Sequence, residues 1–202
     1  MTGVQTCALP ISRFEKLLLA VEETLDWYRL LYLDHRLESW LVYMMAIAAV
    51  LPDRGVADLL KRFPFSEREA TTLKAMRGGA HRLLRQLSKQ PPLKPSGVCR
   101  VLEDVPDEAL LAIMAQSPSD RVKRQVSAYL TSWRQAKPLL TGKELQAMGL
   151  KPGPIFGKVL GQLRDARLDG LVKTESDERT FIESLDRKST RLNSSHVALS
   201  RM

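Results

Sequence analysis

The sequence predicts an all-α protein, an irregular multi-helix array with a helical body and a small helical tail. Apolar residues recur at spacings of three and four along most of the chain, as in Phe14, Leu17, Leu18, Val21 and Leu25. This spacing places them on one face of a helix. No run alternates apolar and polar residues as a half-buried strand does. Glycines and prolines separate the helical patterns and indicate where helices begin and end.

Signals at the helix ends divide the body into successive helices. Pro52 ends one helix, and Asp53 is expected to cap the next. Ser66 and Glu69 have the spacing of a capping box. Gly78–Gly79 is expected to interrupt the helix that follows, because glycine destabilises a helix interior by about 1 kcal/mol relative to alanine. The helices expected before the tail are 13–34, 38–51, 53–63, 66–77, 80–88, 97–102, 107–116 and 119–135.

Proline content indicates the domain boundaries. The segment 90–96 reads QPPLKPS, and its prolines favour extended backbone, so it is predicted to be a linker. The body is then expected to be a helical domain at 12–89 that continues at 97–137. Pro138 ends its last helix. A helical tail is expected at 138–185, with a final helix at 175–185.

The two ends of the chain are predicted not to be native protein. Back-translated, DRKSTRLNSSH at 186–196 gives a sequence like a common sequencing-library adapter, and MTGVQTCALPI at 1–11 gives its reverse complement. One oligonucleotide accounts for both ends. Residues 1–11 and 186–202 are therefore excluded from the interpretation of fold and function.

The composition of residues 12–185 limits the kinds of site and partner that the chain can have. Without the four Lys/Arg and one Asp of 186–202, 27 basic residues face 22 acidic ones, a net charge of +5, which is compatible with a polyanionic partner. Cys99, His35 and His81 are too few for a disulfide or a zinc site. Cys99 is expected to be a core residue, and a reducing cytoplasm is the expected compartment. The apolar run 40–51 is too short to span a bilayer.

The sequence contains no recognisable catalytic constellation. It has no phosphate-cradling glycine loop and no Asp-x-Asp pair. The acidic cluster of Glu103, Asp104, Asp107 and Glu108 is mostly explained as charges at the start of a helix. No catalytic residue and no metal ligand are predicted.

The segment 145–170, LQAMGLKPGPIFGKVLGQLRDARLDG, is the most specific element of the sequence. Gly149 is predicted to end one helix, and Gly153 with Pro154 to begin the next. In that second helix Ile155, Val159, Leu163 and Ala166 share one face. Gly157 and Gly161 lie on another face, and their cost in a helix predicts that something approaches that face closely.

Basic residues gather around this glycine-proline element. Backbone N–H groups at a helix start favour phosphate, and glycines let a sugar-phosphate backbone approach. The alternative is that the glycines permit a tight helix crossing and the lysines are merely solvated; physical reasoning alone leaves both open. The residues predicted to bind RNA phosphate are Lys143, Lys151, Gly153, Gly157, Lys158, Arg164 and Arg167.

The pattern LxxxGLxPGPxxGxxLxxLxxAxLDG at 145–170 resembles the C-terminal region of bacterial tRNA nucleotidyltransferases, the CCA-adding and A-adding enzymes of the poly(A) polymerase family. The likeness is strongest over 140–170 and weaker over 13–137. The resemblance implies an N-terminal α/β head that uses Mg²⁺ and a nucleoside triphosphate, and helical neck, body and tail domains that hold tRNA. This chain resembles the body and tail only, with the catalytic head absent, so no cofactor is expected within it.

The resemblance implies that the parent protein adds CMP or AMP to the 3′ end of tRNA in the cytoplasm. This chain is expected to position tRNA as its partner, to be inactive alone, and to involve neither a membrane nor a stable protein partner. Two alternatives remain. One is a non-catalytic DNA-binding module with a helix-hairpin-helix-like turn, and the other is a helical protein-interaction module.

Overall fold

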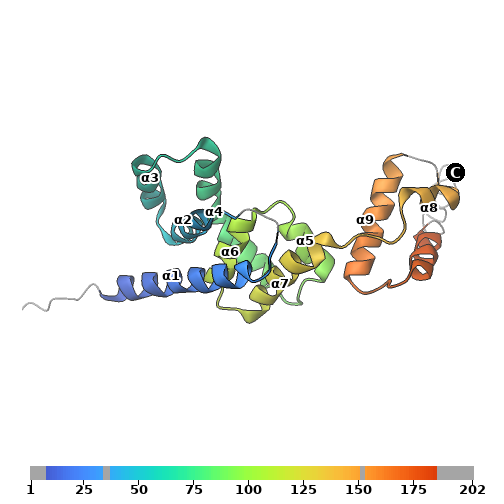
Figure 1. Ribbon diagram of the computed structural model, residues 1–202, viewed down its shortest axis with the longest axis horizontal. Coiled ribbons are helices and arrows are strands. Elements are labelled where there is room, and N and C mark those ends of the chain that lie inside the picture. The colour runs from blue at the N-terminus through green and yellow to red at the C-terminus, as the bar shows by residue number, and fades with distance from the viewer. Residues whose placement is uncertain (1–7, 34–36, 151–152, 186–202) are drawn as a thin grey trace, which may run out of the picture. The chain divides into compact units, whose positions relative to one another are not determined.

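The computed structural model describes residues 8–33, 37–150 and 153–185, and all regular structure within these ranges is helical, as the sequence predicts (Figure 1). Residues 175–185 form a final helical segment. The preceding elements are α1 (Ala8–Arg29), α2 (Ser39–Val50), α3 (Asp53–Arg62), α4 (Glu67–Leu87), α5 (Pro95–Leu102), α6 (Asp107–Gln116), α7 (Asp120–Thr131), a 3-10 turn (Trp133–Gln135), α8 (Gly142–Ala147) and α9 (Pro154–Leu168).

The described residues form two compact units. The first contains 8–93 and Arg100–Thr131, and the second contains Lys94–Cys99 and 132–185. The second unit therefore begins a few residues before the expected tail boundary at 138. It also includes the end of the segment 90–96 that the sequence predicts to be a linker. The predicted domain assignment itself stays a prediction.

The core of the first unit lies around α6, which packs against α1 and α2, while α4 packs against α2. Helix α6 has buried residues on every side, among them Leu110, Leu111 and Ile113, as expected for a central helix. Tyr28 Oη of α1 donates a hydrogen bond to Asp107 at the start of α6 (3.2 Å). Cys99, in the Lys94–Cys99 segment of the second unit, is only 2% exposed, which confirms its expected place in a core.

Helix capping follows the sequence at one predicted start and departs from it at another. Ser66 and Glu69 form the expected capping box, with Ser66 N donating to Glu69 Oε2 (2.7 Å) and Glu69 N donating to Ser66 Oγ (3.3 Å). Asp53, in contrast, is not the cap of α3. Pro52 holds that position, and Asp53 is the first helical residue, where its charge complements the helix dipole.

The expected interruption at Gly78–Gly79 is wrong, because α4 runs unbroken through both glycines. Its buried residues Leu73, Met76, Ala80 and Leu87 continue on one face across the pair. Burial of that face offsets the low helix propensity of glycine, which is a weak preference beside tertiary packing.

Two other helices end earlier than their apolar patterns suggest. Helix α1 ends at Arg29, and Tyr32 adopts a positive φ of 47° in the turn that follows. Helix α7 ends at Thr131, and the remaining expected residues form the 3-10 turn. His35 lies outside the described residues.

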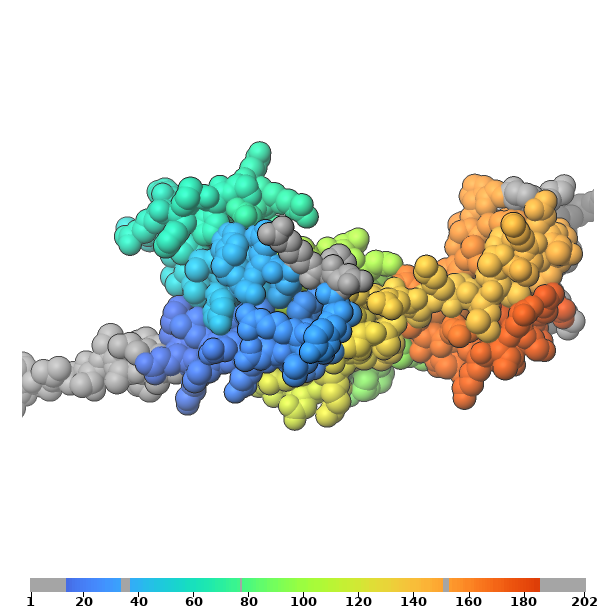
Figure 2. All heavy atoms as spheres, viewed as in Figure 1, coloured from blue at the N-terminus to red at the C-terminus, as the bar shows by residue number. Residues whose placement is uncertain are grey.

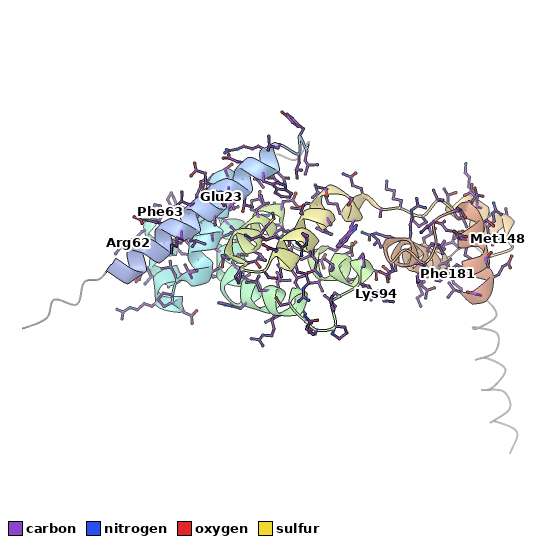
Figure 3. All side chains as sticks on the ribbon, turned by 90° about the horizontal axis from the view of Figure 1, so that it is seen from below. Glu23, Arg62, Phe63, Lys94, Met148 and Phe181 are labelled. Carbon is purple, nitrogen blue, oxygen red and sulfur yellow. The ribbon has the colours of Figure 1, made fainter. Side chains whose placement is uncertain are left out.

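The core of the second unit is built by α8, α9 and the segment 175–185. Leu163 and Leu145 are fully buried in it, and Met148 and Phe181 pack against it from α8 and the final segment (Figure 3). The whole cluster consists of Leu140, Leu145, Val159, Leu163 and Ile182, with Met148, Leu150, Phe156, Leu160 and Phe181 packed against them.

The last residues of the proline-rich segment are held in this unit by one carboxylate. Ser96, 3% exposed, donates hydrogen bonds from its backbone N and its Oγ to Asp169, both at 2.9 Å. Helix α5 accordingly begins at Pro95 rather than at the expected residue 97. Proline at the first helical position is compatible with this start, since its missing N–H would have no partner there.

No helix within the described ranges has both the length and the apolar composition needed to cross a lipid bilayer.

Candidate nucleic-acid interface

The turn that leaves α8 is a Schellman motif built on Gly149. Gly149 has φ +90°, a conformation that favours glycine. Gly149 N donates to Gln146 O (3.0 Å) and Leu150 N donates to Leu145 O (3.2 Å). Leu150 then packs against the cluster that contains Leu145. The predicted end of this helix is therefore confirmed.

Helix α9 begins as the sequence predicts, with Gly153 as its N-cap and Pro154 at its first position. Gly153 has φ 158° and ψ −168°, a region that is essentially restricted to glycine. A Cβ on Gly142, the first residue of α8, would lie 3.5 Å from the ring of Phe156. The beginnings of α8 and α9 therefore lie next to each other.

The face of α9 opposite its core side is bare. At about 100° per residue, Gly157 and Gly161 lie opposite the buried Val159, Leu163 and Ala166. A Cβ built on either glycine would have no described atom within 4 Å. The expectation that something approaches this face closely is therefore not met within the described chain. The tight helix crossing, offered as the alternative role of these glycines, is likewise not seen there.

Two cations of α9 flank this bare face. In helical projection, Lys158 lies on one side of the glycines and Arg164 on the other. Lys158 is exposed, while Arg164 is half-buried and has interactions of its own. Lys143 is also exposed, on the first turn of α8. Gly153, Gly157, Lys158 and Arg164 thus lie at the beginning and on the outer face of α9, while Lys143 lies on α8. Lys151 lies outside the described residues.

Arg167, also predicted to bind phosphate, has a structural partner. Its Nη1 lies 3.5 Å from Oε1 of Glu178, and the Glu178 side chain is fully buried. Glu178 also accepts hydrogen bonds from Leu139 N (3.0 Å) and Leu140 N (2.9 Å). The carboxylate therefore joins the chain before α8 to α9 and to the final segment. These bonds satisfy a charge that would otherwise be costly to bury.

Sequence reasoning did not single out Glu178, although a signal was present. Glu178 precedes Phe181 and Ile182 by three and four residues, which places it on the apolar face of the final helix. An acidic residue on such a face indicates a buried polar anchor, because unpaired carboxylates are rarely buried.

Carboxylates also cap the turns around this site. The pKa of Glu144 is lowered by hydrogen bonds from the hydroxyl and backbone N–H of Thr141. The pKa of Asp177 is lowered by the backbone N–H groups of Lys173 and Thr174, each 2.9 Å from Asp177 Oδ2. No cluster of three or more metal-binding side chains occurs among the residues that the structure describes.

The chain is similar in sequence to proteins named A-adding tRNA nucleotidyltransferase. A protein of Geobacter sulfurreducens named A-adding tRNA nucleotidyltransferase is 33% identical over 162 residues, which cover 78% of this chain and 18% of that protein. A protein of the same name from Deinococcus radiodurans is 49% identical over 47 residues, covering 23% of this chain and 11% of the relative. No protein-family model matches the chain. The chain thus spans about a fifth or less of the length of these relatives.

Solved structures show the same fold. An apo structure of a CCA-adding enzyme superposes with a TM-score of 0.63 at 17% identity, covering 85% of this chain and 40% of the other. An ATP complex of a CCA-adding enzyme gives a TM-score of 0.58 at 16% identity and covers 86% and 40% of the two chains. The chain is therefore a relative of the A-adding tRNA nucleotidyltransferases over most of its length, and its fold is consistent with a helical body and tail region of that family.

Proposed function

We propose that this chain is the tRNA-holding helical part of a nucleotidyltransferase that adds AMP or CMP to the 3′ end of tRNA. The chemical step, with its Mg²⁺ and nucleoside triphosphate, is assigned to parts of such a protein that these residues do not include. The names of the relatives and the small share of their length that the chain spans support this division. The chain alone is then inactive in nucleotide addition.

The observation that carries the proposal is the bare outer face of α9. Gly157 and Gly161 leave helix backbone uncovered, and Lys158 and Arg164 flank it. A sugar-phosphate backbone can approach such a face closely while cations neutralise its phosphates. Recognition of this kind reads the shape of a folded RNA rather than its base sequence.

The test is binding of the full chain to a tRNA transcript across a salt series. We expect the double variant Lys143→Glu/Lys158→Glu to bind about tenfold more weakly, with the log–log salt slope falling by about one for each phosphate that the protein no longer neutralises. Lys151→Glu, combined with Lys158→Glu, is expected to have the same effect. Lys61→Glu, on the exposed end of α3 in the first unit, is the control with the same charge change and should leave binding unchanged.

Competitors separate the other classes of function. Duplex DNA that displaces tRNA at equal concentration would indicate a DNA-binding module instead. Failure of the unmodified chain to bind either nucleic acid would favour a protein-interaction module and would refute the proposal.

A further inference from the structure

Helix α4 carries an exposed basic stripe in the first unit. Between Ala70 and Lys89 the sequence has five Lys or Arg residues and no Asp or Glu. Lys74, Gly78, His81 and Arg85 recur at spacings of four, three and four, which places them on one face. All four are exposed, as are the neighbouring Arg82 and Lys89. The expected break at Gly78–Gly79 had divided these residues between two helices, so their alignment follows only from the continuous helix.

The stripe lies opposite the buried face of α4, which contains Leu73, Met76, Ala80 and Leu87. Neither Lys74, Arg82 nor Arg85 has an ion pair or hydrogen bond with a described residue. Surface cations are ordinarily mixed with acidic residues, which partly neutralise them. Cations that have no acidic partner among the described residues indicate a surface with a positive potential.

Gly78 lies in the middle of the stripe and leaves the helix backbone uncovered there, while Gly79 lies about 100° further around the helix. A Cβ built on Gly78 or Gly79 would have no described atom within 4 Å. Packing within the described chain therefore does not account for either glycine. The beginning of α4 is visible at the upper edge of the first unit in Figure 2.

A groove of about 1130 Å³ borders the same face. Lys74, Gly78 and His81 line it from α4, and Lys16 lines it from α1. Its apolar lining includes Leu17, Val50 and Leu51, and Asp53 is the acidic residue among its lining side chains. A surface with two lysines, one carboxylate and an apolar lining is complementary to a polyanion that also carries apolar sugar faces.

From these observations we propose that the α4 stripe and its groove are a second binding surface for RNA, one that contacts the sugar-phosphate backbone. Lys74 and Arg85 lie about 16 Å apart along the helix at 1.5 Å per residue, a length that spans successive phosphates. Gly78 allows the backbone of the RNA to approach the helix within this length. The inference rests on the proposed function, in which tRNA is the partner, and assigns to that partner a binding surface separate from α9.

The test compares two pairs of substitutions in the full chain. We expect Arg82→Glu/Arg85→Glu to weaken binding of both a tRNA transcript and a plain RNA duplex by about tenfold, and to lower the salt slope by about two. Lys61→Glu/Arg62→Glu, on exposed residues of α3, is the matched control and should change neither. Circular dichroism verifies that each variant is folded.

A second measurement reports directly on RNA at the helix backbone. Gly78 and Gly79 amide signals in a proton–nitrogen NMR spectrum are expected to shift when the RNA duplex is added, and Gly78→Gln should weaken binding at least threefold without unfolding α4. Unchanged affinity and unshifted amides, in a chain whose tRNA binding is weakened by Lys143→Glu/Lys158→Glu, would overturn the α4 surface and leave the proposed function intact. An unmodified chain that binds no RNA would overturn both. Tighter binding to poly-L-glutamate than to the RNA duplex would assign the stripe to an acidic protein and also overturn the inference.

Discussion

Asp169 receives two hydrogen bonds from one residue far away in the sequence, because both the backbone N and the Oγ of Ser96 donate to its carboxylate at 2.9 Å. Ser96 lies in the first turn of α5, where an N–H group has no helical partner. Asp169 therefore caps a helix that is distant in sequence, while it also ends α9 as its C-cap. This pair explains why residues of the proline-rich segment are part of the second unit.

We predict that Asp169→Ala lowers the free energy of unfolding of the second unit by about 1 to 3 kcal/mol, because the buried Ser96 donors lose their acceptor. Thermal denaturation followed by circular dichroism measures the effect. Asp169→Asn, which keeps one carbonyl oxygen, should cost less. Asp58→Ala on exposed α3 is the control, and an equal loss in that variant would refute the assigned role of Asp169.

Glu178→Ala is predicted to destabilise the second unit by about 3 kcal/mol or more. The change leaves Leu139 N, Leu140 N and the half-buried Arg167 without their acceptor. Hydrogen exchange at the Leu140 amide should become much faster in this variant. Glu175→Ala, which removes an exposed partner of Arg179, should cost less than about 0.5 kcal/mol. Slow exchange at Leu140 in the Glu178 variant would contradict the prediction.

Acid is predicted to weaken the second unit through its two capping carboxylates. The folded-state pKa values of Glu144 and Asp177 are both lowered, so their stabilisation is present above the ordinary carboxylate pKa. It is lost as the pH falls through the lowered values, below about pH 4. Denaturation midpoints measured from pH 6 to pH 2.5 should therefore fall more steeply for the unmodified chain than for Glu144→Gln/Asp177→Asn. Parallel curves would show that these caps do not contribute.

Alanine substitution is predicted to have opposite effects on stability at a glycine within α9 and at a glycine in the turn that follows it. Gly161→Ala should raise stability by about 0.5 to 1 kcal/mol, because a Cβ there meets nothing and alanine favours the helix. Gly170→Ala should lower it by about 1 kcal/mol or more, because Gly170 has φ +73°. Urea denaturation distinguishes the two. If Gly161→Ala is more stable but binds tRNA more weakly, glycine at this position favours binding and lowers stability. A loss of stability in Gly161→Ala would instead mean that this face of α9 is packed.

Several features of the fold and site were predictable because they depend on neighbours along the chain. The Ser66–Glu69 capping box, the Gly149 helix end and the Gly153–Pro154 helix start all involve groups within a few residues of one another. Local signals gave the wrong prediction at Gly78–Gly79. Their low helix propensity favours a break, but packing of α4 against residues distant in sequence keeps the helix continuous. For Arg167 the sequence indicates a positive charge, but not the buried Glu178 beside it.

The sequence by itself determined the all-α class, most helix ends and the placement of two glycines on one face of α9, since helical periodicity, capping and the absence of a Cβ are local properties. Only the tertiary structure decided that this face meets no other described segment and which charges are available to a ligand. Arg167 pairs with the buried Glu178, and Asp169 accepts a hydrogen bond from Ser96, so neither charge is fully available to a ligand. The same packing keeps α4 continuous and thereby aligns Lys74, His81 and Arg85 along one exposed face.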